Sequence, residues 1–294
     1  AAQTMINNAG IVIEGFRPGV MERLGLGQDD LNAEVIIGRI TGWGQTGPLS
    51  QSAGHDINYL GLTGALAAMG DPNAPPIPPL NLVADYAGGT MFLIMGVLAA
   101  VIERQTSGKG QTVDAAMVDG VPALMGLLHT FMARGEWTEN RHSNLLDGGA
   151  PFYRCYLTKD SRFMSVGPLE PQFHALLIQG AGLPSEHNDD QNDRSNWIDR
   201  SEQYAQIFVT RTQAEWTELF DGSDACVAPV LSMTEVSSHP HMAARKTMIE
   251  VDGVLQAAPA PRFSRSVSDS VSAPTAAGAD TSEVLAELKL STTK

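Results

Sequence analysis

Short apolar runs alternate with helical patterns along the first third of the chain. Residues 11–13 and 35–40 are two such runs, and each ends in a glycine-rich loop, at Gly15 and at Gly42. Helical spacing of apolar residues then covers residues 21–24, 57–69 and roughly 88–104. Buried strands that alternate with helices predict a parallel sheet covered on both faces. In such sheets ligands bind beyond the carboxyl ends of the strands, where both glycine-rich loops are expected to lie.

A second pattern follows in the rest of the chain. A strand is predicted at residues 112–114, a long apolar segment at 115–133 and a polar, glycine-rich linker at 140–150. Beyond it, residues 152–157 and 163–166 have the pattern of paired strands joined by a turn. Helices are predicted near residues 172–180, 197–210, 214–220 and 283–288, and a Ser- and Ala-rich extended arm at 264–279. Residues 151 to about 251 predict a smaller α+β domain.

Composition narrows the class of protein. The 294 residues are 43% hydrophobic and 18% charged, which is enough apolar material for a substantial core. A formal charge of -14 argues against nucleic acid as a partner, because phosphate backbones need a clustered basic surface. The most apolar run, residues 91–102, is too short to span a bilayer and predicts a buried helix, so no membrane span is expected.

The cysteines and histidines argue against a disulfide-stabilised protein and against a metal site. Two cysteines, Cys155 and Cys226, are too few for a disulfide framework and predict reduced, buried thiols in a cytoplasmic protein. His239 and His241 have one residue between them and no acidic or cysteine companion nearby, so we expect no metal site.

The beginning of the chain also carries an expectation. Ala1-Ala2-Gln3 is followed closely by the apolar run 11–13, so the first residues have the pattern of the end of a helix that leads into a strand. We expect an N-terminal piece of the natural protein to be missing.

Six segments together resemble the family III CoA-transferase superfamily and, within it, the α-methylacyl-CoA racemases. The segments occur in the family's order and cover nearly the whole chain. They are Ile13-Glu14-Gly15-Phe16-Arg17-Pro18-Gly19-Val20, Thr41-Gly42-Trp43-Gly44-Gln45-Thr46-Gly47-Pro48, Gly54-His55-Asp56-Ile57-Asn58-Tyr59, Asn81-Leu82-Val83-Ala84-Asp85, Leu146-Asp147-Gly148-Gly149-Ala150-Pro151-Phe152-Tyr153 and Glu170-Pro171-Gln172-Phe173.

The resemblance implies an α/β fold with a larger, Rossmann-like parallel-sheet domain and a smaller α+β domain. The larger, CoA-binding domain would comprise residues 1–117 and be completed by 252–294. Residues 118–147 would connect it to the smaller domain, 148–251. The resemblance also implies an interlocked homodimer, with the active site between the larger domain of one subunit and the smaller domain of the other.

The chemistry of an acyl-CoA racemase requires two acid/base residues, one on each face of the α-carbon. The resemblance places His55 and Asp85 in these roles, and Glu170 as the carboxylate that pairs with the histidine and raises its basicity. From the residues alone, a loop histidine that bonds to the backbone is the favoured interpretation of His55, and the resemblance reverses this preference. Likewise, Asp85 is consistent with a helix N-cap, and Glu170 with a carboxylate at a helix start ahead of Pro171.

The remaining site residues concern the enolate and the CoA moiety. The backbone N–H of Asp56, at a helix start, is the candidate donor to the enolate oxygen. Arg17 and Arg23 are candidate phosphate or adenosine contacts. Close backbone approach is expected at Gly15 and Phe16, and contacts to the pantetheine and thioester at Gly54, His55, Asp56, Ile57, Asn58 and Tyr59. We expect no metal and no cofactor beyond the CoA of the substrate.

Three hypotheses about the function remain open. The first is a racemase or epimerase of 2-methylacyl-CoA thioesters that uses His55 and Asp85. The second is a CoA-transferase between carboxylates, with Asp85 as the nucleophile that carries a covalent acyl group. The resemblance favours the first, because transferases of the superfamily usually have an aromatic residue at the position of His55. The third is a shortened, inactive chain that binds CoA poorly.

Overall fold

The computed structural model describes residues 1–266 and 271–288. They divide into two compact units. Unit 1 is Ala1–Arg154 with Asp190–Glu202, and unit 2 is Cys155–Asp189 with Gln203–Lys294. The predicted assignment of residues 252–294 to the larger domain stays a prediction, and its residues 267–270 and 289–294 lie outside the described part.

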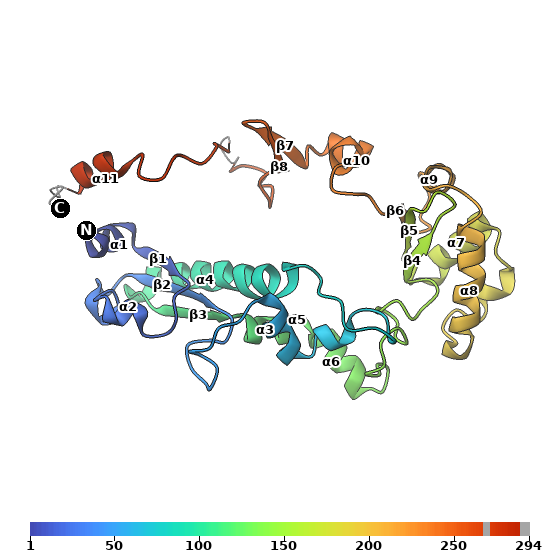
Figure 1. Cartoon of the computed structure of the whole chain (residues 1–294), viewed down its shortest axis with the longest axis horizontal. Helices are drawn as coiled ribbons and strands as arrows, with labels where there is room; N and C mark the ends of the chain where they lie inside the picture. Colours follow the sequence, from blue (N-terminus) through green and yellow to red (C-terminus); the bar gives the residue numbers. More distant parts are fainter. Residues whose placement is uncertain (267–270, 289–294) are drawn as a thin grey trace. The chain divides into compact units, whose positions relative to one another are not determined.

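Unit 1 is built on a three-stranded parallel sheet, in the order β1 (Ile11–Glu14), β2 (Ile36–Thr41) and β3 (Thr112–Ala116) (Figure 1). The first two strands are the predicted apolar runs, and the third is the predicted strand extended by two residues. This confirms the prediction of an α/β fold with a parallel sheet. Glu14 of β1, Arg39 of β2 and Asp114 of β3 lie in register across the sheet.

Helices surround this sheet. On one face, Leu31, Val35 and Ile37 form a buried cluster against which Ile6 packs. On the other face, Ile36 and Ala115 pack with a long helix. The helical segments of unit 1 are α1 (Ala2–Ala9), α2 (Val20–Arg23), η1 (Gln28–Asp30), α3 (Asp56–Thr63), η2 (Leu66–Ala68), η3 (Leu82–Thr90), α4 (Met91–Ser107), α5 (Met117–Leu124), α6 (Gly126–Ala133) and η5 (Arg194–Asn196).

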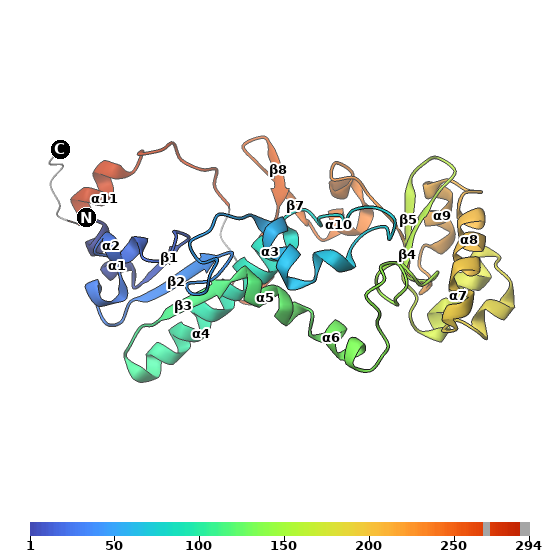
Figure 2. The ribbon, with the colours of Figure 1, turned by 60° about the horizontal axis from the view of Figure 1, so that its bottom comes forward.

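Helix α4 packs closely on the sheet (Figure 2). Glycine residues in both the helix and the sheet allow this close approach. A Cβ atom on Gly38 of β2 would lie 2.9 Å from the side chain of Leu93 and 3.1 Å from that of Val97. In the same way, a Cβ atom on Gly96 of the helix would lie 2.6 Å from Val113 of β3. Glycine in both partners therefore sets the short distance between helix and sheet.

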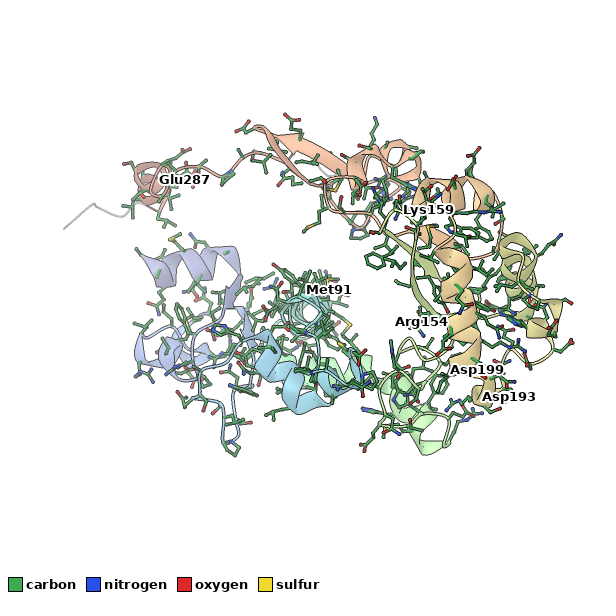
Figure 3. All side chains as sticks on the ribbon, turned by 45° about the vertical axis from the view of Figure 1, so that its right-hand side comes forward. Met91, Arg154, Lys159, Asp193, Asp199 and Glu287 are labelled. Carbon is green, nitrogen blue, oxygen red and sulfur yellow. The ribbon has the colours of Figure 1, made fainter. Side chains whose placement is uncertain are left out.

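The outer face of α4 differs from the prediction of a buried helix. Leu93, Val97 and Ala100 are buried, but the opposite face is apolar and exposed. Its large exposed side chains are Met91, Ile94, Met95, Leu98 and Ile102, and Figure 3 labels the first of them. Together η3 and α4 form one helical stretch, Leu82–Ser107, which by length and composition alone could cross a membrane; 28% of its most apolar window is buried.

Two long predicted helices differ from the structure, since one is interrupted and the other is longer than predicted. The pattern at 57–69 gives α3 and a separate 3₁₀ turn, because Gly64 takes a left-handed conformation with φ of 81° and ends the helix. The pattern at 88–104 begins earlier, in the π-helix η3, before α4 continues it.

The predicted linker at 140–150 is an ordered loop. One carboxylate organises it, since Asp147 accepts hydrogen bonds from the backbone N–H groups of Ser143, Asn144 and Gly149 and from the side-chain amide of Asn144. Asn144 is only 1% exposed. Local side-chain-to-backbone bonds thus fix this segment, and its role as the linker between domains stays a prediction.

Unit 2 contains a three-stranded sheet in the order β4 (Arg154–Leu157), β5 (Phe163–Val166) and β6 (Val227–Pro229). The paired strands β4 and β5 were predicted, whereas β6, antiparallel to β5, was not. Its helical segments are α7 (Pro171–Ala181), η4 (Ser185–Asn188), α8 (Trp197–Phe208, which begins in unit 1), α9 (Gln213–Phe220), η6 (Val236–Ser238), α10 (Pro240–Ala244) and α11 (Thr281–Glu287). An aromatic core holds it together, with Tyr156 and Phe208 stacked at a centroid distance of 5.0 Å.

Two further details of unit 2 differ from expectation. An antiparallel hairpin, β7 (Met248–Val251) with β8 (Val254–Ala257), follows α10 and was not predicted. Cys155 and Cys226 are exposed, not buried as predicted. The final helix, predicted at 283–288, is present as α11.

Candidate functional site

A buried pair of opposite charges joins the carboxyl end of β1 to the neighbouring residue of β2. Arg39 Nε lies 3.3 Å from Glu14 Oε1, an ion-pair distance without hydrogen-bond geometry. The side chains are 10% and 5% exposed. The second oxygen of Glu14 accepts the N–H of Phe16 at 2.7 Å. Glu14 therefore fixes the start of the loop that contains Gly15, Phe16 and Arg17.

Arg39 also reaches the neighbouring segments. Its guanidinium donates to Glu22 Oε1 in α2 and, at 3.0 Å, to Gln45 Oε1 in the loop after β2. The hydrogen bond from Arg39 holds the pKa of the Glu22 carboxyl below its ordinary value. The residue after Glu22 is Arg23, so one buried arginine organises both segments that carry the predicted CoA-binding arginines. Arg17 and Arg23 are themselves exposed.

His55 stands at the N-terminus of α3. It is the N-cap residue, and its N–H donates to Asn58 Oδ1 at 3.0 Å, which fixes the backbone at the helix start. Its side chain is exposed and makes no capping hydrogen bond. The imidazole is therefore available to a ligand.

Tyr59 supports the loop before His55. Its hydroxyl donates to the carbonyl of Gly54, and its ring packs edge-on against Trp43 at a centroid distance of 4.7 Å. A Cβ atom on Gly42 would lie 1.9 Å from the Tyr59 ring. Gly42 thus makes room for this buried tyrosine, whereas Ile57 and Asn58 are exposed.

Asp85 lies in the first turn of η3, beyond its N-cap Asn81, and is not itself the cap. Its half-buried carboxylate accepts a hydrogen bond from Asn81 Nδ2 at 3.3 Å. Its backbone N–H, like that of Ala84, donates to Asp56 Oδ2 at 2.9 Å. The side chain of Asp56 therefore caps η3 and not its own helix, and the N–H of Asp56 stands at the first position of α3, where no acceptor exists within the helix.

The charge of Asp85 in η3 also acts on Tyr59 of α3. Burial raises the pKa of the Tyr59 hydroxyl, and the negative charge of Asp85 raises it further. The geometry agrees, since the N–H groups of Ala84 and Asp85 both donate to the side chain of Asp56 in α3. The predicted residues His55, Asp56, Tyr59 and Asp85 are gathered in one region of unit 1.

Glu170 belongs to unit 2, where it is the exposed N-cap residue of α7, ahead of Pro171. Its side chain makes no capping hydrogen bond. The predicted pairing of Glu170 with His55 stays a prediction.

Within the described ranges, residues 1–266 and 271–288, no group of three or more His, Cys, Asp or Glu side chains could hold a metal ion.

A model of CoA-transferase family III matches residues 1–281 of this sequence. The chain belongs to CoA-transferase family III. Among relatives, it is 43% identical over 291 residues to the α-methylacyl-CoA racemase of Mus musculus, an alignment that covers 96% of this chain and 76% of the mouse protein. It is 44% identical over 242 residues to the α-methylacyl-CoA racemase of Homo sapiens, covering 81% of this chain and 63% of the human protein.

The fold agrees with that of a solved CaiB/BaiF family protein. A CaiB/BaiF family protein from Brucella suis superposes with a TM-score of 0.79 over 98% of this chain and 77% of the Brucella chain. The sequence identity is 23%, so this similarity supports the fold alone.

Within this family site, some contributors were not predicted from sequence. The sequence contains a signal for the Glu14–Arg39 pair, because Glu14 ends one apolar strand and Arg39 is the one charged residue inside the other. Asn81 also had one, since it precedes Asp85 by four residues and can face it on a helix. No sequence signal predicts the hydrogen bond from η3 to Asp56, because 28 residues separate Asp56 from Ala84.

Proposed function

We propose that this protein is a racemase or epimerase of 2-methylacyl-CoA thioesters. The observation that carries the proposal is the hydrogen-bonded link between the two predicted bases. His55 directly precedes Asp56, and the carboxylate of Asp56 accepts the backbone N–H of Asp85 at 2.9 Å. Two acid/base groups of different type are thereby held in one region, as a two-base proton transfer requires. The names of the mouse and human relatives support the same reaction.

The proposed chemistry proceeds through an enolate. One base removes the α-proton, the electron pair of the broken C–H bond moves to the thioester oxygen, and the opposite acid returns a proton to the other face. The N–H of Asp56 is proposed to stabilise the developing oxyanion, since it lies at a helix start with no acceptor inside the helix. Asn81, at 3.3 Å from the carboxylate, would orient Asp85.

Binding of the CoA moiety is assigned to the loops that Arg39 organises. Arg17 and Arg23 are exposed and stand on segments fixed through Glu14 and Glu22. Cationic side chains on a fixed backbone suit phosphate groups, because less conformational entropy is lost on binding. We further propose an interlocked homodimer in which Glu170 of one subunit serves His55 of the other, a cytoplasmic location, and no cofactor beyond CoA.

Proton NMR of a 2-methylacyl-CoA in heavy water tests the function. We expect the α-proton signal to disappear without any added carboxylate, at the same rate in buffer treated with a strong chelator. A CoA-transferase using Asp85 would instead need a carboxylate acceptor and would move CoA to it. If neither reaction occurs, the third hypothesis, an inactive chain, is supported instead.

A further inference from the structure

The side-chain carboxylate of Asp56 has a structural role of its own, besides the role proposed for the backbone N–H of this residue at the oxyanion. Only 6% of the residue is exposed. One oxygen, Oδ2, accepts two hydrogen bonds of 2.9 Å, from the consecutive N–H groups of Ala84 and Asp85. The other oxygen, Oδ1, is buried and has no hydrogen-bond partner among the described residues.

These two bonds define where η3 begins. The first N–H groups of any helix lack acceptors inside it and must find them elsewhere. Asn81, the N-cap of η3, makes no capping bond with its side chain. The acceptor comes from α3 instead, so the backbone position of Asp85 depends on a residue next to His55.

We propose that the Asp56 side chain is a positioning residue that sets the spacing between the two bases, so that inversion at the α-carbon depends on it more than proton removal does. This inference rests on the proposed two-base function. Each enantiomer presents its α-hydrogen to one base. Removal needs that base alone, whereas inversion also needs the second group at the correct distance on the opposite face. If Asp85 moves, His55 can still take a proton and return a solvent deuteron to the same face, which gives exchange without inversion.

The chain offers a matched pair of substitutions. Asp56→Asn keeps an acceptor oxygen for both N–H groups and replaces the unpartnered Oδ1 by an amide. Asp56→Ala removes the acceptor and leaves two N–H groups unsatisfied. The backbone N–H of residue 56 is present in both variants, so oxyanion stabilisation is not removed from either. Asp56→Glu is a third variant, which keeps the charge but displaces the acceptor by one methylene group.

The experiment follows single enantiomers of a 2-methylacyl-CoA in heavy water. Deuterium incorporation is measured by NMR and inversion by chiral chromatography of the hydrolysed acid. In Asp56→Ala we expect inversion to fall about 100-fold, in line with the cost of a misplacement near 1 Å. Exchange of the enantiomer that faces His55 should fall much less, so the ratio of exchange to inversion rises about tenfold or more. Asp56→Asn should keep the wild-type ratio.

The outcomes separate this proposal from the function on which it rests. A wild-type protein that neither exchanges nor inverts would refute the racemase function, and this inference with it. An active wild type with an unchanged ratio in Asp56→Ala, or with the same raised ratio in Asp56→Asn, would overturn the positioning role alone. If circular dichroism shows that Asp56→Ala does not fold, Asp56→Glu decides: a raised ratio supports the proposal, and a wild-type ratio refutes it.

Discussion

Arg39 of β2 and Glu14 at the carboxyl end of β1 form an ion pair, with their side chains 10% and 5% exposed. Replacement of one partner leaves the other as an uncompensated buried charge. We therefore expect Arg39→Met to destabilise the protein by about 3–5 kcal/mol, measured as a lower urea midpoint. The KM for acyl-CoA should also rise, because the segments of Arg17 and Arg23 lose their common partner.

An exposed ion pair is the control for this prediction. Arg134 and Glu136 lie 2.7 Å apart with side chains 66% and 43% exposed, so Arg134→Met should change stability by about 1 kcal/mol or less. The double variant Glu14→Gln/Arg39→Met should recover part of the loss. Equal effects of Arg39→Met and Arg134→Met would show that the buried pair has no special role.

Removal of either proposed base should abolish most turnover. We expect His55→Ala and Asp85→Ala each to lower kcat by about 100-fold or more, the usual contribution of acid/base groups. CoA affinity, measured by calorimetry, should stay close to the wild-type value, because neither side chain is assigned to the nucleotide. The two-base mechanism is wrong if both variants keep more than about a tenth of the activity.

A mixing experiment tests the shared site. His55→Ala and Glu170→Gln should each be inactive as homodimers. If subunits are exchanged by unfolding and refolding together, each hybrid dimer has one site with both defects and one with neither, so activity should return toward half of the wild-type value per hybrid. Light scattering first establishes that the wild type is a dimer. Hybrids that form without recovering activity would rule out a site shared between subunits.

Gly120 of α5 cannot accept a side chain without displacing η3. A Cβ atom there would lie 1.9 Å from the carbonyl oxygen of Gly88. Gly120→Ala should destabilise the protein by about 1–3 kcal/mol and reduce racemisation, because Asp85 is on the displaced helix. Gly126→Ala in α6, with no atom within 4 Å of the added Cβ, should have no harmful effect. Similar urea midpoints for the two variants would contradict this interpretation.

Glu235 should make unit 2 sensitive to acid. Hydrogen bonds from Ser232 and from Arg162 lower the pKa of its carboxyl to about 2, from an ordinary value of 4.5. The stabilisation is therefore complete above pH 4.5 and is lost as the pH falls toward 2, because the unfolded state takes up the proton first. The urea midpoint of Glu235→Gln should depend less on pH in this window than that of the wild type. Ser232→Ala should be intermediate, and parallel pH profiles for all three proteins would refute the prediction.

Sequence patterns located most regular elements because apolar periodicity records which side chains are buried. The strands β1, β2, β3 and β5 lie within about two residues of their predicted ranges. Interruptions were harder to predict. Gly64 ends α3 through its backbone conformation, and apolar spacing continues across it.

Local sequence motifs predicted which residues belong to the candidate site, but not the contacts that position them. His55, Asp56 and Asp85 follow from the family motifs, and their loops follow from the glycines. The contacts that position them, such as Asp56 with η3 and Arg39 with Glu22, join residues far apart in the chain. Such contacts depend on the packing of α3, η3 and the sheet, which no single window of sequence contains.

The exposed outer face of α4 has a thermodynamic consequence. The heat capacity of unfolding grows with the apolar surface that passes from the interior into water. Met91, Met95, Leu98 and Ile102 are already more than half exposed in the folded chain. They add little to that change, so calorimetry of the chain by itself should give a flatter stability curve than expected for a protein of this length with every helix covered.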